Sequence, residues 1–380
     1  MHIYTHCWLL PWWAYNVLHD LILDDIAEQA VSSQNMSIYT IISEKRYMSI
    51  SLDKKNYDIP IKTTLPLWLN DFFIYIQKKQ LPLLNRIFDH RNLIVFAPRL
   101  IWQMSAQLKK AKPTHMTTSS FAVCKNIKIP KSVIKSILYI HSPMQYIHSH
   151  AQEYSTKIRW RKGYIRKKVV PRLLRRDTTP RPAYDEMYAN SRYTAYLTKE
   201  IYWRDCKVKY PQIHMWTLLE TTNLKTKIQQ YTKSDKVTEL ILNNEIFYIY
   251  IWRVVKFVKE VDRIIDLFNF TGDQLLILWS GPDEEELKAQ ANTNIHFLGR
   301  IDDSDLKTTL LSRSSWLINI TKESYGLVTA EAISLWVPVF GYNQWGSVEL
   351  VTESKGVLVE SKDHESLVKD WERFKSKFDK

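Results

Sequence analysis

Short apolar runs alternate with helix-forming segments along this chain, most clearly over residues 317–351. LINI is an apolar run of strand length, TKES is a polar break, and YGLVTAEAISL has the composition of a helix. A second apolar run, VPVF, follows and leads into the polar loop YNQWGS. This succession predicts half of a doubly wound α/β sheet, in which ligands bind at the carboxyl ends of the parallel strands.

The same alternation predicts a complete C-terminal domain over residues 245–380. Its strands are expected in EIFYIYI, QLLIL, NIHFLGRI, LINI, VPVF and GVLVES. Its helices are expected from about Asp262, in DEEELKAQA, in DDSDLKTTLL and over residues 364–377, the last being a candidate to cross back to the first domain. Polar residues 216–244 predict a linker and the start of this second domain.

The first part of the chain predicts another α/β domain over residues 1–215. Helices are expected over residues 13–30 and 66–88. Strands are expected in HIYTH, SIYTIIS, IPIKTT, NLIVFAP, ILYI and KVKYPQI, with SSFAVCK as a loop. At 380 residues the chain is long enough for two domains, each with its own core.

Composition indicates a folded protein with an acidic partner. The chain is 45% hydrophobic and 24% charged, as is usual for globular proteins. Its net charge of +13 favours a phosphate-bearing substrate, an anionic lipid surface or nucleic acid. It has no apolar run long enough for a transmembrane helix, and its N-terminus lacks the basic region of a signal peptide, so we expect neither.

Two acids flank the predicted helix start of the 317–351 stretch. Glu323 and Glu331 are eight positions apart, so they lie on nearby faces about two turns apart. Between them the first-turn N–H groups lack partners inside the helix and attract phosphate; these belong to Tyr325, Gly326, Leu327 and Val328. This pattern would suit a nucleotide sugar, with Glu323 at the hexose, the N–H groups at the diphosphate and Glu331 at the ribose. Two solvated acids on a surface helix are the plain alternative.

These residues also carry a resemblance. ESYGLVTAEAISL, followed by PVFGYNQ and GSVEL, resembles the E-x7-E donor-site signature of retaining glycosyltransferases of family 4, the group 1 glycosyltransferases. The subgroup most resembled acts on mannose-type donors. The resemblance implies the GT-B fold, two Rossmann-like doubly wound domains facing a cleft, with the acceptor on the N-terminal domain and the donor on the C-terminal one.

Other residues extend the resemblance. Arg253 and a following lysine match the segment whose cations neutralise the donor diphosphate, but the spacing leaves Lys256 and Lys259 both as candidates. His141, in HSPMQ, matches a histidine that points at the donor sugar. Gln145 stands where that motif usually has arginine, which puts an acceptor contact in doubt.

Tryptophan is unusually frequent, with 14 Trp against 8 Gly. Trp12 and Trp13, before Ala14, occupy a turn near the expected acceptor site where the resemblance places glycine. Our hypothesis is that a glycine codon has been translated as tryptophan; a protein truly rich in tryptophan is the alternative. The suspect positions are Trp12, Trp13, Trp203, Trp252, Trp279, Trp336 and Trp345.

Residues 157–176 are the most basic run, with basic and apolar residues interleaved. This pattern suits an anionic membrane surface or a phosphorylated acceptor, and a solvated helix face is the alternative. We expect no nucleic-acid partner, because no binding motif accompanies the charge. Asp303-Ser304-Asp305 has D-x-D spacing, but we interpret it as a helix cap and expect no metal.

The resemblance implies a retaining, metal-independent hexosyltransferase without a cofactor, using a GDP- or UDP-sugar, with mannose as the candidate hexose. Its acceptor would be a glycan or a lipid-linked sugar in cell-surface polysaccharide synthesis. The expected location is cytoplasmic, with the inner membrane face as a candidate peripheral site. The alternatives are a nucleotide-sugar hydrolase or epimerase of the same fold, and an inactive homologue that binds sugar nucleotides.

Overall fold

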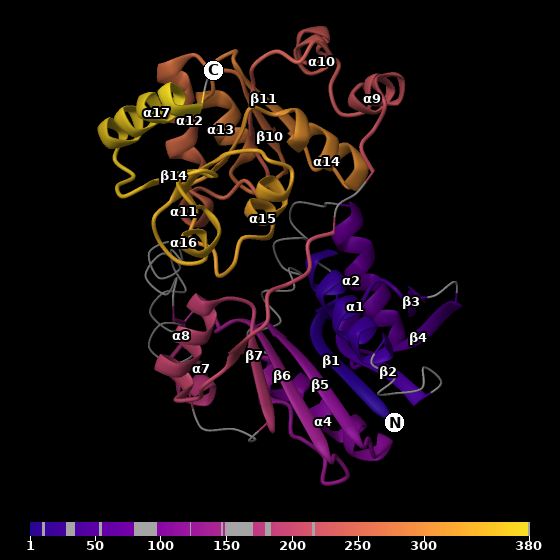
Figure 1. Cartoon of the computed structure of the whole chain (residues 1–380). Coiled ribbons are helices and arrows are strands. Elements are labelled where there is room, and N and C mark those ends of the chain that lie inside the picture. The colour runs from indigo at the N-terminus through magenta and orange to yellow at the C-terminus, as the bar shows by residue number, and fades with distance from the viewer. Residues whose placement is uncertain are drawn as a thin grey trace. The chain divides into compact units, whose positions relative to one another are not determined.

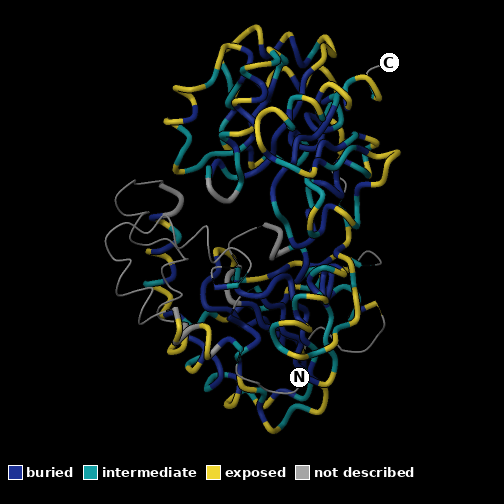
Figure 2. The backbone as a smooth tube through the Cα atoms, turned by 90° about the vertical axis from the view of Figure 1, so that its left-hand side faces the viewer, coloured by how far each residue is buried: buried dark blue, intermediate teal, exposed yellow. Residues whose placement is uncertain are grey.

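The computed structural model describes residues 1–9, 12–27, 35–52, 55–79, 97–121, 123–145, 147–148, 170–178, 184–214 and 217–378. The chain forms two compact units, Met1–Gln212 and Ile213–Lys380 (Figure 1). Buried residues gather in the interior of each unit, and exposed residues lie on its outside (Figure 2). Among the described residues, no helix combines the length and apolar content that a bilayer crossing requires.

The first unit is built on a sheet with the strand order β3-β4-β2-β1-β5-β6-β7-β8. Neighbouring strands are parallel except β3 and β4, which form an antiparallel hairpin. The strands are β1 (His2–Leu9), β2 (Met36–Ser43), β3 (Tyr47–Leu52), β4 (Lys55–Thr63), β5 (His115–Phe121), β6 (Lys135–Ser142), β7 (Glu186–Ala189) and β8 (Lys207–Val208).

Helices accompany this sheet, and some of the predicted elements need correction. The helices are α1 (Trp12–Ala27), α2 (Leu67–Lys79), α4 (Ala97–Ala111), α7 (Val170–Thr178) and α8 (Arg192–Tyr202). The strand predicted at NLIVFAP is wrong at its end, where Ala97 already begins α4; its earlier residues lie outside the described chain. Residues 119–121, expected in a loop, extend β5, because their backbone pairs with β6 although two of the three residues are serines.

The second unit has a parallel sheet in the order β11-β10-β9-β12-β13-β14. Counted in chain order this is 3-2-1-4-5-6, the order of the Rossmann fold. The strands are β9 (Tyr248–Tyr250), β10 (Leu275–Leu278), β11 (Ile295–Gly299), β12 (Trp316–Asn319), β13 (Val339–Tyr342) and β14 (Gly356–Val359).

Helices follow the strands of the second unit, and all but the short α11 and α16 were predicted. They are α11 (Lys256–Lys259), α12 (Val261–Thr271), α13 (Glu284–Gln290), α14 (Ser304–Arg313), α15 (Leu327–Ser334), α16 (Ser347–Leu350) and α17 (His364–Phe378). The segment expected as a linker contains two more helices, α9 (Thr221–Ile228) and α10 (Asp235–Leu242). Their apolar side chains, including Leu224 and Ile241, belong to the core of this unit.

Aromatic side chains join α12 and α17 to the central strands. The Trp371 ring lies 4.7 Å from that of Tyr248 and 5.0 Å from that of Phe268, both in edge-to-face geometry. The Trp316 ring lies 4.0 Å from that of Phe374. Such pairs stabilise beyond their buried area, so α17 is an integral part of the second unit.

Three of the suspect tryptophans have backbone geometry that favours glycine. Six non-glycine residues in the described chain have positive φ, and three of them are Trp203, Trp336 and Trp345, at 53°, 62° and 64°. A bulky side chain is a genuine outlier there. Trp252 and Trp279 are not in this group.

Trp336 illustrates the conflict. It follows the end of α15, where Trp336 N–H donates to the Ile333 carbonyl at 3.2 Å and Val337 N–H to the Ala332 carbonyl at 2.9 Å. This is the Schellman pattern, which places a left-handed residue, usually glycine, at the position of Trp336. The side chain is 92% exposed, so no packing compensates for the strain.

We therefore predict that Trp336→Gly raises the free energy of unfolding by about 1 kcal/mol, because it removes left-handed strain and loses no buried surface. Trp371→Gly is the matched control, because Trp371 is only 1% exposed; it should lower the free energy by at least about 3 kcal/mol. Denaturant titration measures both. A less stable Trp336→Gly protein would contradict the interpretation, and intact mass of protein from its natural source would test the recoding directly.

Candidate functional site

The strand order of the second unit sets the position of its candidate site. The chain builds outward from β9 to β10 and β11, then returns to add β12 on the other side of β9. The loops that follow β9 and β12 therefore emerge side by side at the carboxyl edge of the sheet. In open α/β sheets this reversal point is where ligands bind.

The loop after β12 is held by buried polar contacts. Asn319, at the end of the strand, donates from Nδ2 to Thr329 Oγ1 at 2.8 Å and accepts from Thr321 N–H at 3.2 Å. Further on, Gly346 N–H donates to the Glu323 carbonyl at 3.0 Å. A Cβ on Gly346 would come within 2.6 Å of the Tyr325 carbonyl oxygen, so this close approach requires glycine.

Helix α15 begins at Leu327, two residues later than the expected helix, which began at Tyr325. Gly326 is its N-cap, has a φ of 94° and provides no side-chain cap. The first-turn N–H groups of Leu327 and Val328 thus have no capping side chain, and such groups attract anions. Tyr325 is buried just before the helix.

Glu323 and Lys259 form an ion pair between the two loops, through Oε1 and Nζ. The ammonium group comes from α11, which follows β9, and the carboxylate from the loop after β12. The Lys259 side chain is 21% exposed and the Glu323 side chain 17%, so the pair is partly accessible to solvent. Burial, followed by the nearby charge of Glu323, raises the pKa of Tyr250 well above its ordinary value.

Lys256 has different partners from Lys259. Its Nζ lies 2.6 Å from Glu286 Oε1, and its backbone N–H donates to Asp283 Oδ2 at 2.8 Å. The hydrogen bond to Glu286 raises the pKa of Lys256. Arg253 is half-buried in the same loop. The structure therefore separates the two candidate lysines, bringing Lys259 to Glu323 and directing Lys256 towards α13.

Glu331 lies on α15 and is buried. Its Oε2 is 3.2 Å from the Nζ of Lys307, a buried lysine of α14. Burial raises the pKa of Glu331, and the charge of Lys307 opposes that rise. The sequence interpretation missed Lys307, although a lysine beside apolar residues in DLKTTLL was an available signal.

His141 belongs to the first unit, at the end of β6, and is buried. Its Nε2 is 2.7 Å from the hydroxyl of Ser119, in β5. Its ring lies 6.0 Å from that of His6, in β1. Burial, followed by the proximity of His6, lowers the pKa of His141 well below its ordinary value, so the imidazole is neutral at pH 7. The sequence interpretation missed Ser119, because it expected that residue in a loop.

The remaining predicted residues of the first unit are only partly described. Gln145 lies half-buried in the turn after His141. Helix α1 begins at Trp12 and includes Trp13 and Ala14, whose side chains lie outside the described part of the structure.

Most of the basic run 157–176 lies outside the described residues, which resume at Val170 in α7. Asp177 fixes this helix: it is buried and accepts from His148 at 2.9 Å and from Tyr202 at 2.8 Å, and it also pairs with Lys125. Leu174 and Arg175 are exposed on the same helix. The expected membrane contact therefore remains a prediction.

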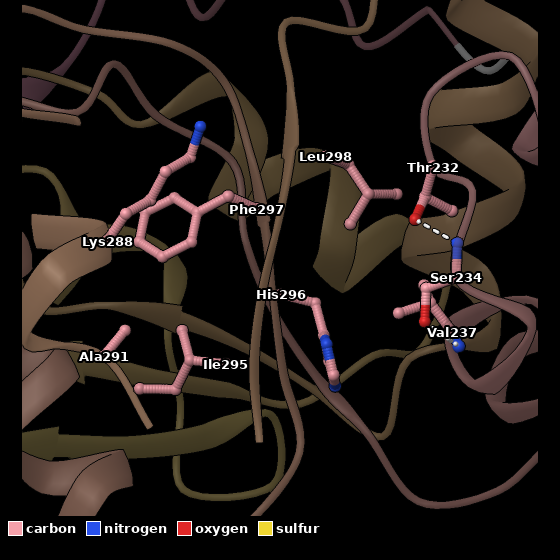
Figure 3. Close-up of a pocket in the computed structure, with 9 residues that line it drawn as sticks. All are labelled: Thr232, Ser234, Val237, Lys288, Ala291, Ile295, His296, Phe297 and Leu298. Atoms are coloured by element: carbon pink, nitrogen blue, oxygen red, sulfur yellow. Dashed lines mark hydrogen bonds between the residues drawn. The ribbon is translucent and has the colours of Figure 1, made fainter. Parts of the chain in front are cut away.

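A hollow of about 310 Å³ lies along the edge strand β11 (Figure 3). None of the expected donor-site residues lines this hollow, so the hollow is not the expected donor site. Among the described residues, no cluster of three or more His, Cys, Asp or Glu side chains could hold a metal ion. The hollow along β11 is lined by Thr232, Ser234, Val237, Lys288, Ala291, Ile295, His296, Phe297 and Leu298.

Comparisons with known proteins agree with this architecture. Residues 230–377 match the family model described as Glycosyl transferases group 1. A GDP-mannose-dependent monoacylated alpha-(1-6)-phosphatidylinositol monomannoside mannosyltransferase of Corynebacterium glutamicum is 33% identical over 104 residues. That match covers 25% of this chain and only 27% of the relative.

Solved structures are similar over nearly the whole chain. HepE from Anabaena, in complex with UDP and glucose, is 14% identical with a TM-score of 0.57, covering 98% of this chain and 89% of its own. WaaG, a glycosyltransferase involved in lipopolysaccharide biosynthesis, is 13% identical with a TM-score of 0.60, covering 97% and 90%. At this identity the likeness shows the fold.

The fold is GT-B, with two Rossmann-like units. The match to the group 1 glycosyl transferases lies within the second unit, and the structural neighbours show the fold of the two units.

We predict that Gly326→Ala lowers the free energy of unfolding by about 1 kcal/mol, because alanine is strained at a φ of 94°. If the expected donor site is correct, it should also weaken nucleotide-sugar binding about tenfold or more, because the added Cβ lies 3.3 Å from Thr329 Oγ1 and shifts the first turn of α15. Unfolding and titration calorimetry measure the two effects.

Gly272→Ala is the matched control. Gly272 also has positive φ, at 74°, but an added Cβ meets nothing within 4 Å. It should lose similar stability and keep full binding; equal binding losses in both variants would contradict a specific role for Gly326.

Proposed function

We propose that this chain is a retaining, metal-independent hexosyltransferase that moves a sugar from a nucleotide donor to a glycan or lipid-linked acceptor. One observation carries the proposal. At the reversal point of the second sheet, a lysine and a carboxylate from adjacent loops meet beside the helix whose N-terminus has no side-chain cap. This arrangement offers positive charge, N–H donors and a hydroxyl-binding acid together.

The chemistry divides between these groups. As the bond from the hexose to the diphosphate breaks, negative charge grows on the departing phosphate, which Lys259, Arg253 and the first-turn N–H groups of α15 would stabilise. Positive charge grows on the sugar, as in other glycosyl transfers. Glu323 would orient the hexose or stabilise that charge, and Glu331 would accept hydrogen bonds from the ribose.

The ion pair of the free protein fits a donor that replaces it. In the free protein, Lys259 occupies the position beside Glu323 that the hexose would take. Glu323 likewise occupies the position beside Lys259 that the diphosphate would take. Each charge therefore has a partner before the donor binds. The pair's partial exposure supports this exchange, because a partly solvated pair contributes little stability and is easily broken.

His141, in the first unit, would contact a hydroxyl of the donor sugar. A neutral imidazole has one donor and one acceptor, which suits a sugar hydroxyl. Its hydrogen bond with Ser119 limits the orientation of the ring. Gln145, and the turn at Trp12, Trp13 and Ala14, would contact the acceptor.

The relatives suggest two classes of donor and one class of acceptor. The mannosyltransferase of Corynebacterium glutamicum is named for GDP-mannose and a phosphatidylinositol mannoside, which supports mannose transfer to a lipid-linked sugar. The complex of HepE with UDP-glucose supports a UDP-sugar instead. We propose a GDP- or UDP-hexose donor, a role in polysaccharide synthesis, and a cytoplasmic protein that contacts an anionic membrane surface through residues 157–176.

A panel of nucleotide sugars, with product analysis in the presence and absence of acceptor sugars, tests the proposal. Transfer to an acceptor with retained anomeric configuration supports it. Hydrolysis with water as the only acceptor would favour a hydrolase, and donor binding without turnover would favour an inactive homologue.

We predict that Glu323→Ala lowers kcat at least about 100-fold, because the carboxylate acts on the reacting sugar. Glu331→Ala should chiefly raise the KM for the donor, by about tenfold to 100-fold, because hydrogen bonds to a charged group are worth about 1.5–3 kcal/mol. Steady-state kinetics separate the two effects. Full turnover by Glu323→Ala would refute the assignment.

We also predict that Lys259→Met weakens binding of nucleoside diphosphates about tenfold or more, since it removes a cation at the phosphate position. Lys256→Met is the matched control from the same short helix, because Lys256 is held by Glu286, and it should change affinity less than about twofold. Titration calorimetry measures both variants. The reverse order of effects would transfer the phosphate role to Lys256.

A further inference from the structure

The ion pair between Lys307 and Glu331 is one of the most enclosed in the second unit. Its atoms are 3.2 Å apart, and each side chain is only 9% exposed. Lys307 comes from α14, which precedes β12, and Glu331 from α15, which follows that strand. The contact therefore joins the helix before β12 in the sequence to the helix after it, and β12 leads into the expected donor loop.

A buried pair of this kind is weak evidence of a stabilising role. The cost of removing two charges from water often exceeds their attraction, so apolar replacements are commonly neutral or stabilising. What the lysine does provide is a fixed contact at 3.2 Å that orients the buried carboxylate, and a positive charge that opposes the rise in its pKa. Both matter if Glu331 must accept hydrogen bonds.

We infer that Lys307 is a positioning residue of the ribose subsite, holding Glu331 as an oriented carboxylate that accepts from the ribose hydroxyls of the donor. This inference rests on the proposed function, in which Glu331 meets the ribose. An ionised carboxylate only accepts hydrogen bonds, so it matches two neighbouring hydroxyl donors. Lys307 occupies Oε2 and so directs the hydroxyls to the other oxygen and the remaining lone pairs.

Contacts from the segment before β9 hold α14 in place. Asp303 caps the helix by accepting from Leu306 N–H at 2.9 Å, and Lys227 of α9 lies 2.5 Å from the same carboxylate. Thr309 Oγ1 accepts from Leu219 N–H at 2.9 Å. The region expected to be a linker thus supports the helix that carries Lys307.

The test compares affinities for UDP and GDP with those for their 2′-deoxy counterparts, using pyrophosphate as a probe of the phosphate position alone. Wild-type protein should prefer the ribose form of its nucleotide by about tenfold, the worth of one hydrogen bond to a charged group. Lys307→Met should reduce that preference to about onefold and leave pyrophosphate affinity unchanged. Glu331→Gln should lose the preference as well.

Lys375→Met is the matched control, because Lys375 pairs with Asp273 at 2.7 Å in the same unit and contacts neither α14 nor α15 through that pair. It should keep the full preference for ribose. A simple loss of stability cannot imitate the result, because it would not change the ratio between ribose and deoxyribose forms. Circular dichroism establishes that each variant is folded.

If Lys307→Met does not fold, the double variant Lys307→Met/Glu331→Gln carries the test, since it leaves no buried charge without a partner. It should have the same affinities as Glu331→Gln alone. A further loss shared by ribose and deoxyribose forms would mean that Lys307 contacts the nucleotide itself, and would overturn the inference.

Two other outcomes separate the inference from the proposed function. If Lys307→Met keeps the preference, or if the wild-type protein binds nucleotides without one, the inference is wrong and the donor site stands. If the wild-type protein binds neither nucleotide, the proposed function fails first and the inference with it.

Discussion

The ion pair between Lys259 and Glu323 depends on the spatial order of the strands in the second sheet. Because β12 is added beside β9, two loops separated by a large part of the domain emerge at one edge of the sheet. Each loop brings a charge that would be costly to bury alone. Their pairing satisfies both charges and leaves them near a helix N-terminus without a side-chain cap. In the proposed function, an anionic ligand with hydroxyl groups replaces this contact.

The two acids of the E-x7-E motif are thus in different electrostatic environments. Glu323 pairs with a lysine in a partly exposed contact, whereas Glu331 pairs with a lysine in a nearly enclosed one. A contact that solvent reaches can be exchanged for a ligand at little cost. A contact shielded from solvent persists, because breaking it leaves a buried charge without a partner. The same motif therefore combines one carboxylate suited to exchange with one suited to fixed orientation.

Two glycines at the carboxyl edge of the second sheet lie so close to a neighbouring loop that a side chain at either position would clash with its backbone. Gly346 approaches the Tyr325 carbonyl, and a Cβ on Gly281 would lie 1.9 Å from the Val254 carbonyl oxygen. Both contacts join neighbouring loops at the carboxyl edge of the sheet. Tryptophan at Trp345, directly before Gly346, has a φ of 64°, so strain and close packing meet in one loop. Glycine at position 345 would relieve the backbone strain without disturbing the close packing at Gly346.

Local patterns in the sequence were enough to predict the alternation of strands and helices in the second unit and the helix beyond Glu323, because apolar runs and helical composition are local properties. The GT-B class came from the resemblance carried by the E-x7-E stretch. The sequence did not predict the end of β5, because that segment becomes a strand through its pairing with β6. It did not predict α9 and α10 either, because their apolar side chains pack against distant residues of the core. Only the tertiary structure separated Lys259 from Lys256, joined Lys307 to Glu331 and placed Ser119 beside His141. These contacts depend on which strands become neighbours, and strand order is a property of the assembled sheet that no single segment encodes.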